Sequence, residues 1–86
     1  MRDTLSLPLL TSQQLGLALR SRRKHLGLTQ EELGRRVGLS QNRVSHLERN
    51  PGEISFKQLL AWSATLNLEL TVSDRKKYEP APGVEW

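Results

Sequence analysis

Residues 29–49 read TQEELGRRVGLSQNRVSHLER, and this stretch decides the fold. Thr29 followed three residues later by Glu32 is the pattern of a capping box, which opens a short helix. Gly38 is placed to end that helix, because glycine readily takes the left-handed conformation of a helix C-cap. Ser40 then caps a second helix, which runs to the end of the stretch. Two short helices joined by so tight a turn predict a helix-turn-helix.

The second of these helices has two chemically different faces. With about 100 degrees between successive residues, Val44 and Leu47 point to one side and are expected in the core. The opposite side is almost wholly hydrogen-bonding. Gln and Asn can present a donor and an acceptor together to adenine, and Arg can donate twice to guanine, so this face suits the DNA major groove. Its residues are Gln41, Asn42, Ser45, His46 and Arg49.

The chain before this stretch predicts a basic helix. Ser12 can cap it and Gly27 ends it. Between them, apolar residues from Leu15 to Leu26 recur at helical spacing, with basic residues interleaved. These and later arginines would neutralise DNA phosphates, which predicts a steep fall of affinity with salt. The arginines expected in this role are Arg20, Arg22, Arg35, Arg36 and Arg43.

The chain after the stretch predicts a further helix and a strand. Ser55 caps a helix through Leu66, whose apolar residues exceed the width of one stripe. Residues 68–73 then alternate apolar with polar, the period of a half-buried strand, and the chain offers it no second strand. Such a strand needs a partner, so we expect a homodimer around this region. The expected dimer residues are Trp62, Leu66, Leu68, Leu70 and Val72, although Trp62 also suits core packing.

Length and composition allow one domain with a modest core. The chain has 86 residues, of which 36% are hydrophobic, so a second independent core is excluded. We expect a mainly α, compact repressor-like domain of four to five helices, with one C-terminal β-strand that pairs across a homodimer. The expected parts are an N-terminal leader (1–10), the helix-turn-helix domain (11–67), the dimerisation strand (68–73) and a flexible C-terminal tail (74–86).

The charge is distributed unevenly along the chain. Residues 1–50 carry nine Lys and Arg against four Asp and Glu, net +5, whereas residues 51–86 carry four against five, net −1. A basic half is a candidate surface for a polyanion such as DNA, although a charge run taken alone is more often a solvated face. No apolar run approaches the ~20 residues of a membrane span, and we expect a cytoplasmic, nucleoid-associated protein.

The sequence offers little support for catalysis or metal binding. The chain has no Cys, which excludes disulfides, thiolate nucleophiles and Cys-based metal sites. His25 and His46 lie on different predicted helices without a carboxylate pattern beside them. Ser45 points about 100 degrees away from its neighbour His46, and no nucleophile elbow is present. We therefore expect no enzyme, no cofactor and no metal.

From about Leu15 to Val72, the sequence resembles the XRE, or phage-repressor-like, helix-turn-helix domains. The resemblance implies a DNA-binding domain in which Arg23 forms an ion pair with Glu48 between helices. Gly34 departs from the pattern, because Ala is usual there and Gly lowers helix propensity. The residues that carry the resemblance are GLTQEEL at 27–33, VGLSQ at 37–41, Val44, Ser45 and LERN at 47–50.

The resemblance also assigns roles to the residues of the predicted interface. In this family the residue matching Gln30 holds a phosphate, which a helix N-terminus also favours. The residues expected at DNA bases are Gln41, Asn42, Ser45 and His46. Those expected at phosphates are Thr29, Gln30, Arg36, Arg43 and Arg49.

The C-terminal part is similar to that of HipB-type antitoxins, which are encoded with HipA-like serine/threonine kinase toxins. The similarity rests on the predicted strand at 68–73 and on the charged tail that ends in Glu85 and Trp86. It implies an antitoxin that binds inverted-repeat operator DNA, represses its own operon and docks Trp86 on the toxin. A stand-alone repressor without a protein partner is the alternative. A helical bundle that binds only proteins would carry a more acidic outward face.

Overall fold

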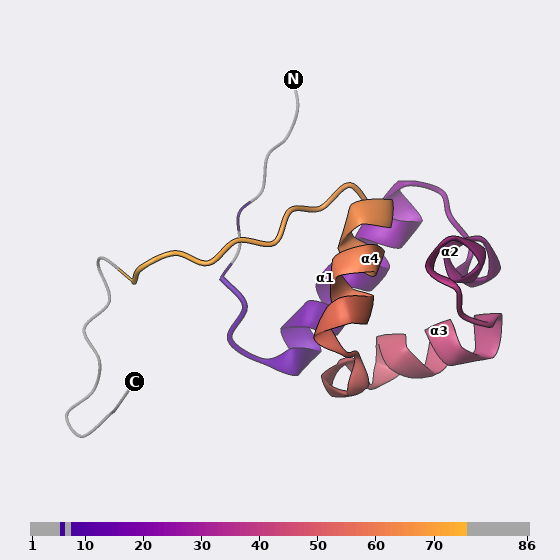
Figure 1. The fold of residues 1–86 in the computed structure, drawn as a ribbon, viewed down its shortest axis with the longest axis horizontal. Coiled ribbons are helices and arrows are strands. Elements are labelled where there is room, and N and C mark those ends of the chain that lie inside the picture. Colours follow the sequence, from indigo (N-terminus) through magenta and orange to yellow (C-terminus); the bar gives the residue numbers. More distant parts are fainter. Residues whose placement is uncertain (1–5, 7, 76–86) are drawn as a thin grey trace.

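The computed structural model describes residue 6 and residues 8–75. There the chain forms α1 (Ser12–His25), α2 (Gln30–Val37), α3 (Gln41–Arg49), the 3₁₀ turn η1 (Pro51–Glu53) and α4 (Phe56–Thr65). Figure 1 shows α2 nearly end-on beside α3, which runs across the view. Because α2 contacts both α3 and α4 while α1 contacts α3 and η1, all elements share one core. The mainly helical, compact fold expected from the sequence is confirmed.

Side-chain caps set where the helices begin. The backbone N–H of Glu32 donates to Thr29 Oγ1 at 3.0 Å, and the N–H of Thr29 donates to Glu32 Oε1 at 2.8 Å. This is the predicted capping box of α2, which satisfies N–H groups that a helix start leaves unpaired. Gly38 ends α2 in the left-handed conformation, with φ at +78°, and Ser40 caps α3. The two helices are thus fixed by the residues that predicted them.

The first helix is capped by Thr11 and not, as predicted, by Ser12. The N–H of Gln14 donates to Thr11 Oγ1 at 3.1 Å, and Gln14 Oε1 accepts from the N–H of Thr11 at 3.0 Å. A capping box needs a Glu or Gln three residues after the cap. Thr11 has Gln14 at that distance, whereas Ser12 has the apolar Leu15. The polar partner decides the cap, and Ser12 becomes the first helical residue.

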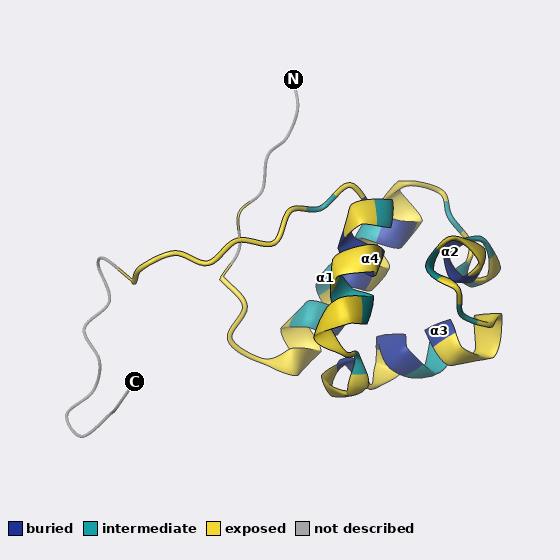
Figure 2. Ribbon diagram, in the orientation of Figure 1, coloured by how far each residue is buried: buried dark blue, intermediate teal, exposed yellow. Residues whose placement is uncertain are grey.

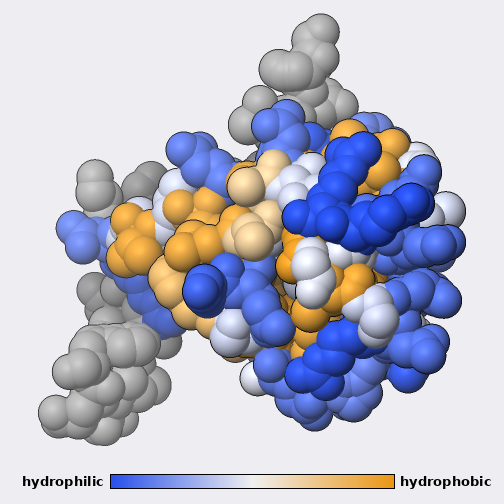
Figure 3. Space-filling model, turned by 45° about the vertical axis from the view of Figure 1, so that its right-hand side comes forward, coloured by the Kyte–Doolittle hydropathy of each residue, from blue (hydrophilic) through white to orange (hydrophobic). Residues whose placement is uncertain are grey.

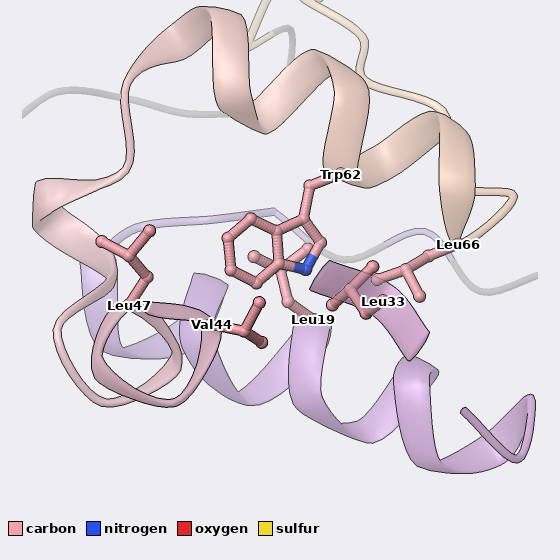
Figure 4. Packing of buried hydrophobic residues seen from close by; sticks show 6 residues of the cluster. All are labelled: Leu19, Leu33, Val44, Leu47, Trp62 and Leu66. Carbon is pink, nitrogen blue, oxygen red and sulfur yellow. The ribbon is translucent and has the colours of Figure 1, made fainter. Parts of the chain in front are cut away.

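The core is small and centred on the indole of Trp62. Figure 4 shows this ring lying among aliphatic side chains contributed by α1, α2, α3 and the end of α4. A ring wholly removed from water contributes several kcal/mol, and truncation of such a side chain costs about 3–5 kcal/mol. Figure 2 shows the buried residues where the helices face one another. The fully buried side chains are Leu19, Leu33, Val44, Leu47, Trp62 and Leu66.

Two glycines allow backbone segments to approach closely. A Cβ added to Gly34 would clash with the carbonyl oxygen of Leu39, whose own N–H donates to the Gly34 carbonyl at 2.8 Å. A Cβ added to Gly16 would lie 2.9 Å from Cγ of Pro51. The turn between α2 and α3 and the contact between α1 and η1 therefore both exclude a side chain. At residue 34 this steric reason explains the departure from the usual Ala.

The residues that follow α4 form no strand within the part of the chain that the structure describes. Asn67 takes a φ of +58°, and the N–H of Leu68 donates to the Ser63 carbonyl at 2.8 Å, which turns the chain. Leu68 packs against the core, whereas Leu70 and Val72 are exposed. A strand that needs a second copy cannot form in one chain, so the strand at 68–73 and its pairing across a homodimer stay predictions.

Two residues expected at the dimer interface lie inside the core of one chain. Trp62 and Leu66 are each 0% exposed in this chain. Core packing of Trp62 and Leu66 is thus observed within one chain, and their place at a dimer interface stays a prediction. The wide apolar face of α4 is used partly within the domain, because that face must cover α1 and α2 as well as α3. Trp86 lies outside the described residues.

Candidate nucleic-acid interface

The outer face of α3 is polar and directed away from the core. Val44 and Leu47 are fully buried, as the helical spacing predicts. Ser45 and His46 are half-buried on the outer side. The remaining residues of this side are exposed, namely Gln41, Asn42, Arg43 and Arg49. The structure therefore brings all the residues predicted to read bases onto one helix face.

A buried ion pair supports this helix from behind. Arg23 Nε lies 2.7 Å from Glu48 Oε2, and the two side chains are only 8% and 2% exposed. Arg23 Nη2 donates to the other carboxylate oxygen at 3.2 Å, while Nη1 donates to the carbonyl of Leu28 at 2.8 Å. The pair predicted between α1 and α3 is thus formed, in a two-pronged geometry that strengthens such contacts.

The ion pair continues into the predicted interface through two glutamines. Gln30 Nε2 donates to Glu48 Oε1 at 3.0 Å, and Gln41 Nε2 donates to Gln30 Oε1 at 3.2 Å. The first residues of α2 and α3 are thereby connected to the buried carboxylate. Sequence reasoning placed Gln30 and Gln41 at DNA but missed this connection, because nothing in the local pattern says that the two side chains meet.

The N-terminus of α2 forms a shallow hollow suited to an anion. Free N–H groups and the helix dipole favour negative charge at this end. Glu32 already exploits this environment: its hydrogen bond from the backbone N–H of Thr29 lowers the pKa of its carboxyl below the ordinary value, with further contributions from the Thr29 side chain, Arg35 and Arg36. The hollow is lined by Arg23, Gly27, Leu28, Thr29, Gln30, Glu31 and Gln41.

The second half of the α3 outer face is occupied by contacts within the chain. Arg49 Nη1 donates to Ser45 Oγ at 2.8 Å. His46 Nε2 lies 2.8 Å from Glu53 Oε1 in η1, so this ring nitrogen faces a carboxylate and not solvent. Glu53 was not predicted as a site residue, because it follows the helix and meets His46 only through the turn at Pro51. The sequence signal that could have found it is a single acidic residue beyond a basic helix.

One arginine expected at phosphates also makes a hydrogen bond within the chain. Arg22 is half-buried and its Nε donates to the carbonyl of Leu66 at 3.0 Å, at the end of α4. A cation at a helix C-terminus stabilises the carbonyl groups there. The other arginines of that set are exposed, namely Arg20, Arg35, Arg36 and Arg43.

The opposite kind of surface lies on α4. Phe56 and Leu60, one turn apart, are 68% and 47% exposed, and Leu17 of α1 is 65% exposed. Figure 3 shows such hydrophobic surface in orange next to the blue of hydrophilic residues. Over residues 6 and 8–75, no cluster of three or more metal-ligating side chains occurs, and no helix has the length and hydropathy to span a bilayer.

Comparisons with known proteins agree with this geometry. A family profile described as "Helix-turn-helix" matches residues 19–72. The antitoxin HipB of two Escherichia coli strains is 33% and 31% identical to the chain over 67 residues, covering 78% of this chain and 71% and 76% of the relatives. Among solved structures, a "HipB-O4 20mer complex" has a TM-score of 0.73 and a "HipA-HipB-O2-O3 complex" one of 0.74. Each is 27% identical and covers 81% of this chain and 99% of its own.

Proposed function

The chain belongs to the helix-turn-helix family of the XRE, or phage-repressor-like, type, with HipB antitoxins among its relatives, and from this premise we propose that it is a sequence-specific DNA-binding antitoxin. The observation that supports this best is the outer face of α3. Its exposed Gln41 and Asn42 can each offer a donor and an acceptor to a base edge. The buried ion pair and Gln30 hold Gln41 in place before DNA arrives, which lowers the ordering cost of binding.

The proposed base contacts all lie on α3, whereas the proposed phosphate contacts lie on α2, on its N-cap and on α3. The residues proposed to contact bases are Gln41, Asn42, Ser45 and His46. The residues proposed to contact phosphates are Thr29, Gln30, Arg36, Arg43 and Arg49. The first group would set sequence preference, and the second would supply affinity that falls with salt.

We propose that the protein acts as a homodimer on an inverted-repeat operator upstream of its own operon. Leu70 and Val72 expose apolar side chains with nothing in the described chain to cover them, and Leu68 anchors that segment to the core. A two-fold axis there would place two α3 helices about 34 Å apart, one turn of B-DNA, or a multiple of it. Repression of the operon follows from occupancy of that operator.

We also propose that the protein binds a HipA-like serine/threonine kinase toxin. The support is the "HipA-HipB-O2-O3 complex" among its structural neighbours, together with the identity of the HipB relatives. Trp86 is proposed as an anchor for this partner, because Trp is enriched at binding hot spots. The alternative, a stand-alone repressor, needs the same α3 face and differs only in having no toxin.

One experiment separates the two functions. The full chain is titrated against the DNA upstream of its own gene and against a kinase encoded beside it, with a truncation after Tyr78 as the matched variant. We expect both forms to bind the DNA and only the full chain to bind the kinase tightly. Equal kinase affinity would dismiss Trp86 as an anchor, and no preference for the upstream DNA over a scrambled duplex would dismiss sequence-specific recognition.

A further inference from the structure

The pair formed by His46 and Glu53 is not explained by the proposed DNA contacts. His46 Nε2 lies 2.8 Å from Glu53 Oε1, and the side chains are 40% and 55% exposed. On the other side of the ring, Asn50 Nδ2 lies 3.5 Å from His46 Nδ1. A carboxylate can only accept hydrogen bonds, so the N–H at Nε2 is the donor in this contact. While the pair persists, this nitrogen is not available to a base.

Glu53 is held in this position by the backbone around it. Its N–H donates to the carbonyl of Asn50 at 3.0 Å, and the N–H of Ile54 donates to the carbonyl of Pro51 at 3.1 Å. Pro51 is itself buried against Gly16 of α1. The backbone of Glu53 is therefore held beside the end of the α3 outer face, and its carboxylate reaches His46 from there.

The surroundings of the pair are basic or uncharged. Arg43 and Arg49 lie one turn before and after His46 on α3. The part of α1 that faces η1, residues 12–19, carries no charged side chain, and Lys57 is the first charged residue of α4. The other carboxylate of α3, Glu48, is neutralised by Arg23. Glu53 is thus an exposed negative charge on a face otherwise suited to phosphates.

We propose that Glu53 is a specificity-determining residue of the DNA interface: its hydrogen bond withdraws Nε2 of His46 from base contacts, and its charge weakens binding to DNA of any sequence. The inference rests on the proposed DNA-binding function. Glu53 acts in two ways: by holding the ring of His46 and by repelling the negatively charged phosphates of the DNA backbone. An unheld imidazole could donate to or accept from several base edges, so holding it narrows the range of sequences that bind.

The test uses two substitutions that separate the hydrogen bond from the charge. Glu53→Gln keeps an oxygen that accepts from His46 but removes the charge, whereas Glu53→Ala removes both. Asp74→Asn removes the same charge from an exposed residue away from α3 and serves as the control. The probes are a duplex selected by the full wild-type chain from a random pool and a scrambled duplex of the same length.

We expect Glu53→Gln to tighten binding to both duplexes by about two- to fivefold, the scale of an exposed charge interaction. The ratio of the affinity for the selected duplex to that for the scrambled duplex should not change. Glu53→Ala should tighten binding to the scrambled duplex similarly and also lower the ratio. His46→Ala leaves no ring to make unselective base contacts, so combining it with Glu53→Ala should restore the ratio that Glu53→Ala alone lowers. In ¹⁵N NMR of the imidazole, wild type and Glu53→Gln should show a protonated Nε2.

The proposal is overturned if Glu53→Ala keeps the wild-type ratio or if Glu53→Gln binds the scrambled duplex no better than wild type or the Asp74→Asn control. Thermal unfolding of each variant shows whether a change in binding arises from a loss of folded protein. An exposed pair contributes little stability, so the unfolding temperatures should match that of the wild type. Failure of the wild-type chain to select any duplex would instead count against the proposed function. In that case the charge effect is still measured on scrambled DNA.

Discussion

The first turn of α3 exposes a polar surface to solvent, whereas the outward side of α4 exposes an apolar one. Gln41 on α3 is polar and connected through Gln30 to a buried carboxylate. Phe56 and Leu60 on α4 are apolar and exposed. The α3 surface is organised completely within one chain, whereas the α4 surface and the exposed Leu70 beyond it remain uncovered apolar area, which usually marks an interface. The difference supports the proposal that the DNA-reading face is prepared within one chain and that the apolar surface contacts a second chain.

The largest expected loss of stability comes from removing the buried carboxylate of Glu48, to which Arg23 and Gln30 both donate. Glu48→Ala leaves the guanidinium of Arg23 buried without its partner, which should lower the free energy of unfolding by about 3–5 kcal/mol. Urea unfolding followed by circular dichroism measures this loss. Glu31→Ala, at an exposed position of α2, is the control and should change stability by no more than ~0.5 kcal/mol. A loss below 1 kcal/mol for Glu48→Ala would mean that Arg23 finds water in the absence of the carboxylate.

The next effect concerns the apolar surface. Leu70→Lys should weaken the proposed homodimer by about 10- to 100-fold for each side chain removed from the interface, since a buried Leu contributes about 1.5–3 kcal/mol. The monomer should unfold at an unchanged temperature, because Leu70 lies outside the core cluster. Sedimentation velocity over a range of concentrations measures dimerisation. Leu17→Lys makes the same substitution at an exposed residue of α1 and should leave the dimer intact. If both variants lose the dimer, the interface includes α1 as well.

The sequence predicted best what is decided by neighbours along the chain. Thr29, Ser40 and Ser55 were recognised as caps because the side chains that complete a cap lie within three residues. The cap of α1 was displaced by one residue for the same reason, since Gln14 and not Leu15 can complete it.

What the sequence did not reveal depends on contacts across the fold or between chains. The connection of Gln30 with Glu48 spans 18 residues, and the pairing of His46 with Glu53 depends on how η1 packs on Gly16. Trp62 was open to two interpretations because helix periodicity shows that a face is apolar without showing what covers it. The strand predicted at 68–73 would need a second copy to pair with, so it stays a prediction that one chain cannot display.

A smaller expected effect is on DNA affinity, and it tests whether the hydrogen bond from Gln41 to Gln30 positions Gln41 for a base. Gln41→Ala should cost about 1–3 kcal/mol per half-site and relax preference at one base position. Gln30→Ala should weaken binding to all sequences, as expected for a phosphate contact, and should additionally relax the same base position because Gln30 holds Gln41. Competition assays with a panel of single-base operator variants measure both. If the double variant loses as much as the two single variants added together, the glutamines act independently and the connection has no role in reading.

The smallest effect is the contribution of the Glu32 carboxylate to the N-terminus of α2. The hydrogen bond from the N–H of Thr29 lowers the pKa of Glu32 in the folded state, so the carboxylate stabilises the fold above its ordinary pKa of 4.5. That contribution is lost as the pH falls through the lowered folded value, because the unfolded chain then binds the proton first. The thermal midpoint should therefore fall between about pH 6 and about pH 3, and less steeply in Glu32→Gln, whose amide oxygen keeps the capping box without titrating. Glu32 lies beside the hollow at the N-terminus of α2, where only phosphate contacts are proposed. Glu32→Gln should therefore leave the order of base preferences unchanged. A changed order would mean that the cap of α2, and not only the face of α3, takes part in recognising the DNA sequence.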